Sequence, residues 1–134
     1  MEQPRISPWE NASLPEGWSL PLELLELARE GEIDLVSEVF AIFRSDTGMR
    51  LEALGQAIAG ADMTVVRKQA HALKGSSGQV GATALAQMCR QMEESAANGN
   101  MADVNSLLHR MQAQFEQICC SMASLDLAEL ACGR

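Results

Sequence analysis

The sequence has few aromatic residues and no long hydrophobic run, and these shortages limit the protein classes it can belong to. Aromatic residues make up 4% of the 134 residues, and tyrosine is absent. The core must therefore be filled by aliphatic side chains, methionine and alanine, several of which strongly favour helices. No apolar run approaches the roughly 18 residues of a membrane-spanning helix. We therefore expect a compact helical domain that does not cross a membrane.

Basic residues are also scarce, which argues against a polyanionic partner. The chain has 10 basic and 18 acidic residues, giving a formal net charge of −8 at pH 7. Proteins that bind nucleic acids or anionic membranes gain much of their affinity by placing lysine and arginine against phosphates. We therefore expect neither nucleic acid nor a membrane surface as a partner.

The cysteines show no pattern typical of a disulfide framework or a metal site. No two of them form a C-x-x-C pair, and none has histidine at zinc-ligand spacing. The N-terminus also lacks the apolar core of a signal peptide. We expect reduced thiols, no bound metal and a cytoplasmic location. The four residues are Cys89, Cys119, Cys120 and Cys132.

The two ends of the chain differ from its middle. Residues 1–18 are interrupted by prolines and a glycine, which predicts a non-helical lead-in that Trp9 and Trp18 pin against the domain. Residues 126–134 are expected to form a flexible tail. The domain itself should cover residues 19–125.

Apolar periodicity within the domain predicts helices and no strands. Residues recur in steps of three and four, as on one face of a helix. Asp62 and Asn100 suit helix N-caps, and Gly48 is expected to interrupt or bend the longest helix. The sequence therefore predicts an all-α, antiparallel four-helix bundle with a short additional N-terminal helix. The expected helices run from about residue 21 to 30, 33 to 58, 63 to between 76 and 81, 83 to 98, and 100 to 125.

One of the two histidines lies on the outer face of the third main helix. At about 100° per residue, His71 falls opposite the apolar residues Val66, Ala70 and Leu73. Those residues should face the core, so the imidazole should face solvent.

The chain's scarce cations gather around this histidine. No acidic residue occurs from residue 63 to 92, whereas Arg67, Lys68, Lys74 and Arg90 all fall in that range. Nearby cations disfavour a charged imidazole, so we expect His71 to be neutral and nucleophilic. They would also stabilise an anion on the ring, such as a phosphoryl group.

Glycines follow the histidine along the same helix. Gly75 and Gly78 would leave bare backbone beside the ring, which allows a second macromolecule to approach closely. His109 differs, because it has Arg110 beside it and no glycine nearby, and we expect it to be ordinary surface.

The histidine and the glycines after it have other possible roles. An exposed histidine on a helix is often only solvated surface, and composition leaves both interpretations open. The segment GSSGQVG matches no nucleotide-binding loop, because its lysine precedes the glycines and no strand leads into it. Hydrolysis is not expected, because no carboxylate lies near His71 in sequence and a single exposed helix offers no water-excluding pocket.

The segment HALKGSSGQVGA resembles the signature of histidine-containing phosphotransfer (HPt) domains. That signature has a histidine, two residues, Lys-Gly-Ser, and later Leu-Gly-Ala, with valine replacing the leucine here. The following segment, LAQMCRQMEE, is similar to the family's next helix. The resemblance covers about residues 19–125. The matching residues are His71, Lys74, Gly75, Ser76, Val80, Gly81, Ala82, Cys89, Met92 and Glu93.

The resemblance implies a role in multistep two-component phosphorelays. His71 would accept a phosphoryl group on Nε2 from a receiver-domain aspartate and pass it to another receiver. Lys74 would neutralise phosphoryl charge, with Arg67 and Lys68 adding positive potential. The residues implied at the receiver-docking surface are Gly75, Gly78, Gln79 and Glu93, of which the last two could hold the ring or the lysine.

The resemblance also implies the partners and cofactors. Receiver domains of response regulators or of a hybrid sensor histidine kinase would bind a monomer, with an apolar docking surface beside His71. Mg²⁺ is expected on the receiver, and no cofactor on this chain. The chain would be a phosphocarrier rather than an autonomous enzyme, and no autokinase activity is expected, because no room remains for an ATP-binding domain. The alternative is an HPt-like adaptor that binds receiver or kinase domains without phosphotransfer.

Overall fold

The computed structural model describes residues 16–125, which form five α-helices joined by short turns. The expected lead-in and tail, together with Trp9 and Cys132, lie largely or wholly outside this range. Within it, no helix is both long and apolar enough to cross a membrane. The helices are α1 (Leu22–Arg29), α2 (Ile33–Ala59), α3 (Met63–Gln79), α4 (Thr83–Ala97) and α5 (Met101–Ser124).

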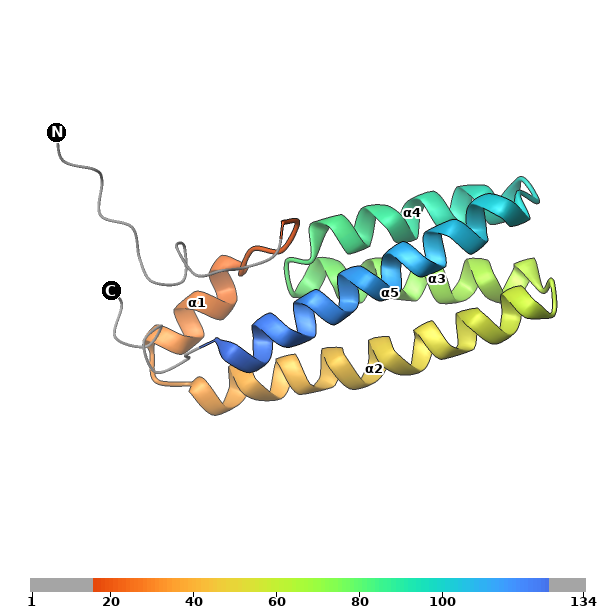
Figure 1. Cartoon of the computed structure of the whole chain (residues 1–134). Coiled ribbons are helices and arrows are strands. Elements are labelled where there is room, and N and C mark those ends of the chain that lie inside the picture. Colours follow the sequence, from red (N-terminus) through yellow and green to blue (C-terminus); the bar gives the residue numbers. More distant parts are fainter. Residues whose placement is uncertain (1–15, 126–134) are drawn as a thin grey trace, which may run out of the picture.

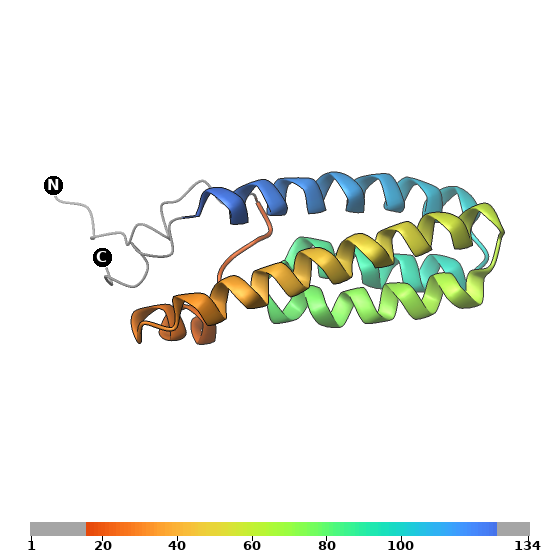
Figure 2. The ribbon, with the colours of Figure 1, turned by 90° about the horizontal axis from the view of Figure 1, so that it is seen from below.

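The four longer helices form an antiparallel bundle. Helices α2 and α4 each pack against both α3 and α5, so the four helices enclose one core (Figures 1 and 2). Helices α2 and α5, with 27 and 24 residues, are longer than α3 and α4 and project past the α3–α4 turn. The short helix α1 packs on the projecting part of α2. The predicted fold class is confirmed.

The helix ends follow local sequence signals. The Asp62 carboxylate accepts a hydrogen bond from the Val65 amide at 3.3 Å and so caps α3. The Asn100 side chain accepts one from the Asp103 amide at 3.1 Å and caps α5 in the same way. Helix α2 continues through Gly48, so the expected interruption there is absent. Packing on both sides of α2 outweighs the weak helix propensity of one glycine.

The core is built from the apolar stripes that the sequence displays. Helix α5 contributes six buried residues, and Phe115 and Leu125 lie at the margin of the core; the six are Val104, Leu107, Leu108, Met111, Ile118 and Met122. Helix α3 contributes four buried residues in steps of four, three and four, which places its opposite face in solvent. Those four residues are Val66, Ala70, Leu73 and Ser77.

A short strap, residues 16–20, crosses the α3–α4 turn before α1 begins. Trp18 in this strap is 3% exposed, and its indole Nε1–H donates a hydrogen bond to the Val80 carbonyl at 2.8 Å. Its ring also meets Phe40 edge-on, with the ring centroids 6.0 Å apart. Trp18 therefore anchors the strap in the core, as the sequence suggested.

Backbone hydrogen bonds hold the strap against the turn. The Ser19 amide donates to the Gly81 carbonyl at 3.1 Å, and the Gly17 carbonyl accepts from the Ala84 amide at 3.1 Å. Trp18 and Ala82 form an isolated antiparallel bridge. A Cβ added at Gly81 would lie 1.8 Å from the Ser19 carbonyl oxygen, so only glycine permits this approach. The strap thus fixes the turn from which α3 and α4 diverge.

A comparison of two glycine substitutions should isolate the contribution of the strap. Gly81 and Gly99 each follow the C-cap residue of a helix, with φ of +80° and +70°, but a Cβ at Gly99 would meet nothing within 4 Å. Gly99→Ala should lower the free energy of unfolding by about 1–2 kcal/mol, from backbone strain alone. Gly81→Ala should cost about 1–3 kcal/mol more, because displacing the strap breaks buried hydrogen bonds. Urea unfolding would measure both, and equal losses would contradict the role given to the strap.

Candidate functional site

His71 lies on the solvent-facing side of α3. Its side chain is 71% exposed, while Ala70 and Leu73, on the other side of the helix, are fully buried. The outward orientation predicted from the helical periodicity is therefore observed. The neighbouring helix α4 supplies the residues that the imidazole contacts.

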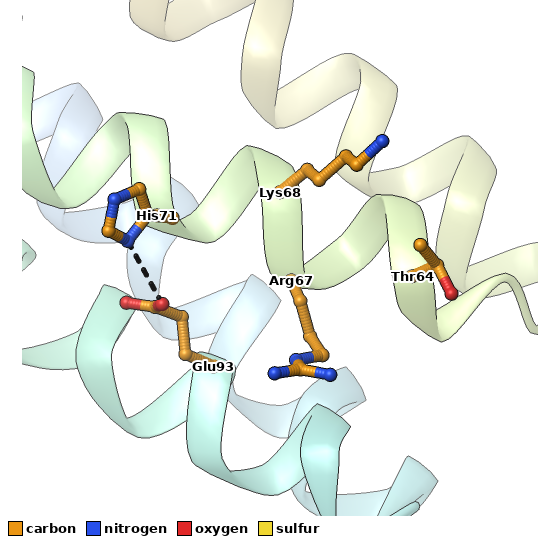
Figure 3. Close-up of a pocket in the computed structure, with 5 residues that line it drawn as sticks. All are labelled: Thr64, Arg67, Lys68, His71 and Glu93. Atoms are coloured by element: carbon orange, nitrogen blue, oxygen red, sulfur yellow. Dashed lines mark hydrogen bonds and ion pairs between the residues drawn. The ribbon is translucent and has the colours of Figure 1, made fainter.

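Glu93 of α4 provides a carboxylate next to His71. Its Oε2 lies 3.2 Å from the imidazole Nδ1, as the dashed line in Figure 3 marks. Glu93 is the first acidic residue after the acid-free segment, 22 positions from His71. No carboxylate lies near His71 in sequence, but Glu93, which the family resemblance suggested could hold the ring or the lysine, contacts the ring in the fold. The antiparallel packing of α3 and α4 brings the two side chains together.

Glu93 also contacts Lys74. The Lys74 ammonium Nζ lies 2.8 Å from Glu93 Oε1, so each carboxylate oxygen faces a different partner. Partial burial acts to raise the pKa of the Glu93 carboxyl, but hydrogen bonds and positive charge from Lys74 and His71 outweigh it and hold the pKa below its usual value. The carboxylate is therefore ionised at neutral pH.

The ionised carboxylate determines which imidazole nitrogen carries the proton. A carboxylate without a proton only accepts hydrogen bonds, so Nδ1 of His71 must be the donor to Glu93. In the neutral ring, Nε2 then holds the free electron pair. Figure 3 shows the other ring nitrogen pointing away from Glu93. The site thus presents an oriented nucleophilic nitrogen to solvent.

A pocket of about 370 Å³ lies beside the imidazole, between α3 and α4. It is lined by Thr64, Arg67, Lys68, His71 and Glu93. Thr64 was not identified from the sequence, although it lies seven residues before His71 and so on the same helical face. Figure 3 shows Arg67 extending towards α4 and Lys68 towards α2, neither of them towards the ring. Of the three cations implicated by sequence, Lys74 alone joins the Glu93 network.

The remaining residues implicated by the sequence lie towards the end of α3. A Cβ added at Gly75 or Gly78 would meet nothing within 4 Å, so the surface there is open. Gln79, the last residue of α3, is exposed. Within residues 16–125 no hydrogen bond joins Gln79 to His71 or Lys74. Of Gln79 and Glu93, the two residues that could hold the ring or the lysine, it is Glu93 that contacts both.

His109 lacks these surroundings. It is exposed on α5, and its Nδ1 lies 2.9 Å from the Asn105 carbonyl of its own helix. No carboxylate or lysine contacts it among the described residues. This agrees with its assignment as ordinary surface.

Cys89 lies on α4 one turn before Glu93, but its thiol is not a second nucleophile. It is fully buried, and burial raises its pKa to about 12, with the Glu93 charge adding to the rise and the Lys74 charge opposing it. A thiol that stays protonated is a poor nucleophile and a poor metal ligand. Among residues 16–125, no three His, Cys, Asp or Glu side chains gather in a way that could hold a metal ion.

The chain is similar to known proteins in both sequence and structure. The family model described as the Hpt domain matches residues 38–119, more than half of the chain. The structure resembles the crystal structure of histidine-containing phosphotransfer protein B (HptB) from Pseudomonas aeruginosa PAO1, with 29% sequence identity and a TM-score of 0.70. That match covers 78% of this chain and 90% of the other. No curated protein matches the chain.

The lowered pKa of Glu93 predicts a pH-dependent contribution to stability. A carboxyl whose pKa is lowered by folding stabilises the folded state above its unfolded pKa, and loses that effect as pH falls through its folded pKa. Glu93→Gln should therefore destabilise the protein at pH 7, and the difference from the unaltered chain should shrink below about pH 4.5. Urea unfolding at several pH values measures this. Glu94→Gln, at an exposed neighbouring residue, is the matched control, and a pH-independent difference at Glu93 would contradict the prediction.

Proposed function

This chain belongs to the Hpt domain family and acts in histidine phosphotransfer within phosphorelays, and on that premise we propose that His71 is its phosphoaccepting residue. One observation carries this assignment. His71 is exposed, its Nδ1 is held by Glu93, and its Nε2 is open to a partner. His109, the other histidine, has no comparable network among residues 16–125.

The proposed reaction needs no group on this chain beyond those already described. The Nε2 electron pair of His71 attacks the phosphorus of a receiver's aspartyl phosphate, forming an N–P bond. The P–O bond to the aspartate breaks, and the aspartate carboxylate leaves with its electron pair. The proton on Nδ1 stays in the hydrogen bond to Glu93, whose negative charge stabilises the positive charge that develops on the ring.

The second transfer reverses these steps on another receiver. An aspartate carboxylate of that receiver attacks the phosphorus, and the N–P bond breaks as the electron pair returns to Nε2. Because Glu93 keeps a proton on Nδ1, the ring leaves as a neutral imidazole rather than an anion. The same hydrogen bond therefore assists both directions of transfer.

Lys74 is the cation placed to contact the phosphoryl group. Its Nζ has three N–H donors, and the contact with Glu93 occupies part of that capacity. A phosphoryl group on Nε2 would compete with Glu93 for the ammonium. We propose that the receiver holds Mg²⁺ with its own carboxylates, since phosphoryl transfer depends mainly on positioning and charge neutralisation.

An exposed apolar row on α2 supplies the rest of the proposed receiver-docking surface. Leu35, Ile42 and Met49 recur every seven residues and are 41%, 62% and 69% exposed. Arg50 of α2 donates a hydrogen bond to Gln69 of α3, which fixes how these antiparallel helices align. Met49 precedes Arg50 by one residue and His71 follows Gln69 by two, so Met49 and His71 lie at nearly the same level.

The surface between this row and His71 offers little obstruction. Gly75 and Gly78 of α3 lie near the level of Ile42 along the bundle axis, past the level of Met49. A Cβ added at either glycine would meet nothing within 4 Å. A receiver can therefore bury the apolar row while its aspartyl phosphate reaches Nε2. We also propose that the chain acts as a monomer in the cytoplasm, because a monomer leaves this face open. The three described cysteines are free thiols, which fits a reducing compartment.

Substitution of the two histidines should identify the phosphoacceptor. Incubation with a phosphorylated receiver and Mg²⁺ should give the unaltered chain an acid-labile, base-stable phosphate. His71→Gln should abolish this label, because it removes the nucleophile, whereas His109→Gln should accept label as the unaltered chain does. Circular dichroism would check that both variants remain helical. Labelling of His71→Gln at the parent level would contradict the assignment.

Serine substitutions along the α2 row should define the docking surface. Met49→Ser and Ile42→Ser should each raise the KM for the receiver by about tenfold, since burial of such a side chain contributes about 1.5–3 kcal/mol. Leu35 lies at the end of the row, two helical turns beyond Ile42 and farthest from His71, so Leu35→Ser should have a smaller effect. Steady-state phosphotransfer kinetics would measure this. An unchanged KM in both Met49→Ser and Ile42→Ser would contradict the proposed surface.

A further inference from the structure

The pocket beside His71 contains two cations that the phosphotransfer chemistry described above does not use. We propose that Arg67 and Lys68 bind an acidic side chain of the partner receiver, and so help to select the partner instead of stabilising the transferred phosphoryl group. This inference rests on the proposed function, because it takes a receiver as the partner that docks over His71.

The side chains of Arg67 and Lys68 point away from the imidazole that would carry the phosphoryl group. Both residues lie about one turn before His71 on α3, yet Figure 3 shows Arg67 extending towards α4 and Lys68 towards α2. Lys74, on the other side of His71, is the cation that shares Glu93 with the imidazole. The phosphoryl group on Nε2 therefore has one cation at hand without Arg67 or Lys68.

Neither cation has a partner of its own within residues 16–125. Arg50, by contrast, pairs with Asp46 at 3.0 Å and also bonds Gln69. The only carboxylate that lines the pocket among the described residues is Glu93, and both of its oxygens already face His71 and Lys74. Two positive charges without a partner among the described residues thus line one pocket in a chain of net charge −8.

The chemistry of the pocket suits a carboxylate from another protein. A volume of about 370 Å³ exceeds that of several water molecules, at roughly 30 Å³ each, so an entire side chain can enter. Arg67 and Lys68 supply charge, and the Thr64 hydroxyl supplies a further hydrogen-bond donor. A chain of net charge −8 presents few such places to a carboxylate, so this pocket would direct the approach of the receiver.

Two consequences distinguish partner recognition from phosphoryl stabilisation. Cations that bind the partner affect the KM for the receiver and its dependence on salt, because charge-guided association weakens with ionic strength. Cations that bind the phosphoryl group affect kcat and the lifetime of the phosphohistidine. The two roles can therefore be separated with one set of variants.

The experiment uses the full chain and the receiver that transfers to it with the highest kcat/KM in a panel. Lys68→Gln and Arg67→Gln should each raise the KM severalfold, and the double variant about tenfold, with kcat changed less than about twofold. The slope of log(kcat/KM) against log salt concentration should also become shallower. Arg110→Gln, an equal change in charge at a groove between α4 and α5, should show neither effect.

The opposite results would overturn the inference. If the double variant shortens the phosphohistidine lifetime while the KM stays constant, the two cations stabilise the phosphoryl group. If its KM rises no more than that of Arg110→Gln, the pocket does not bind the partner. Loss of all label from His71→Gln in the same assay remains the separate test of the proposed function, so the two ideas can fail independently.

Discussion

The contact between Glu93 and His71 is the interaction on which the site depends. One oxygen of the carboxylate accepts a hydrogen bond from Nδ1–H, and the other faces the Lys74 ammonium. This arrangement fixes the tautomer of an exposed ring, which would otherwise rotate and exchange protons with water. It also holds the Lys74 ammonium beside the ring that we propose as the nucleophile. A single carboxylate thereby orients the ring and positions the lysine.

Packing of the bundle holds the neighbouring helices α3 and α4 in register. His71 and Lys74 belong to α3 and Glu93 to α4, so a shift of one helix by a single turn, about 5.4 Å, would break both contacts. Buried residues on both helices resist such a shift from the core side. The strap resists it from the end of the bundle, where Trp18 fastens the α3–α4 turn. Stability of the fold and geometry of the site therefore have a common origin.

Features set by local sequence could be predicted, whereas those set by packing between helices could not. The outward direction of His71 follows from apolar spacing within one helix, and the cap at Asp62 follows from its own short side chain. The role of Glu93 across the helix interface was suggested by family resemblance and could not be derived from spacing. Gly48 illustrates the reverse error, because a local signal predicted an interruption that packing on α2 overrides.

The apolar row on α2 and the pocket beside His71 were not located by sequence for the same reason. Periodicity identifies the residues that face the core, but an exposed Ile42 or Met49 differs from its neighbours only once the adjoining helices are placed. Thr64 could have been found, since it shares a helical face with His71. Together these residues form a surface on which charge, apolar area and a nucleophile lie within reach of one partner.

The position of the phosphoryl group on the imidazole tests the central claim most directly. Phosphorus and nitrogen NMR of the protein, after phosphorylation by a receiver, would identify both the histidine and the ring nitrogen that carries the phosphate. If Glu93 holds the Nδ1 proton, the phosphate must be on Nε2 of His71. A phosphate on Nδ1 of His71, or on His109, would contradict the account.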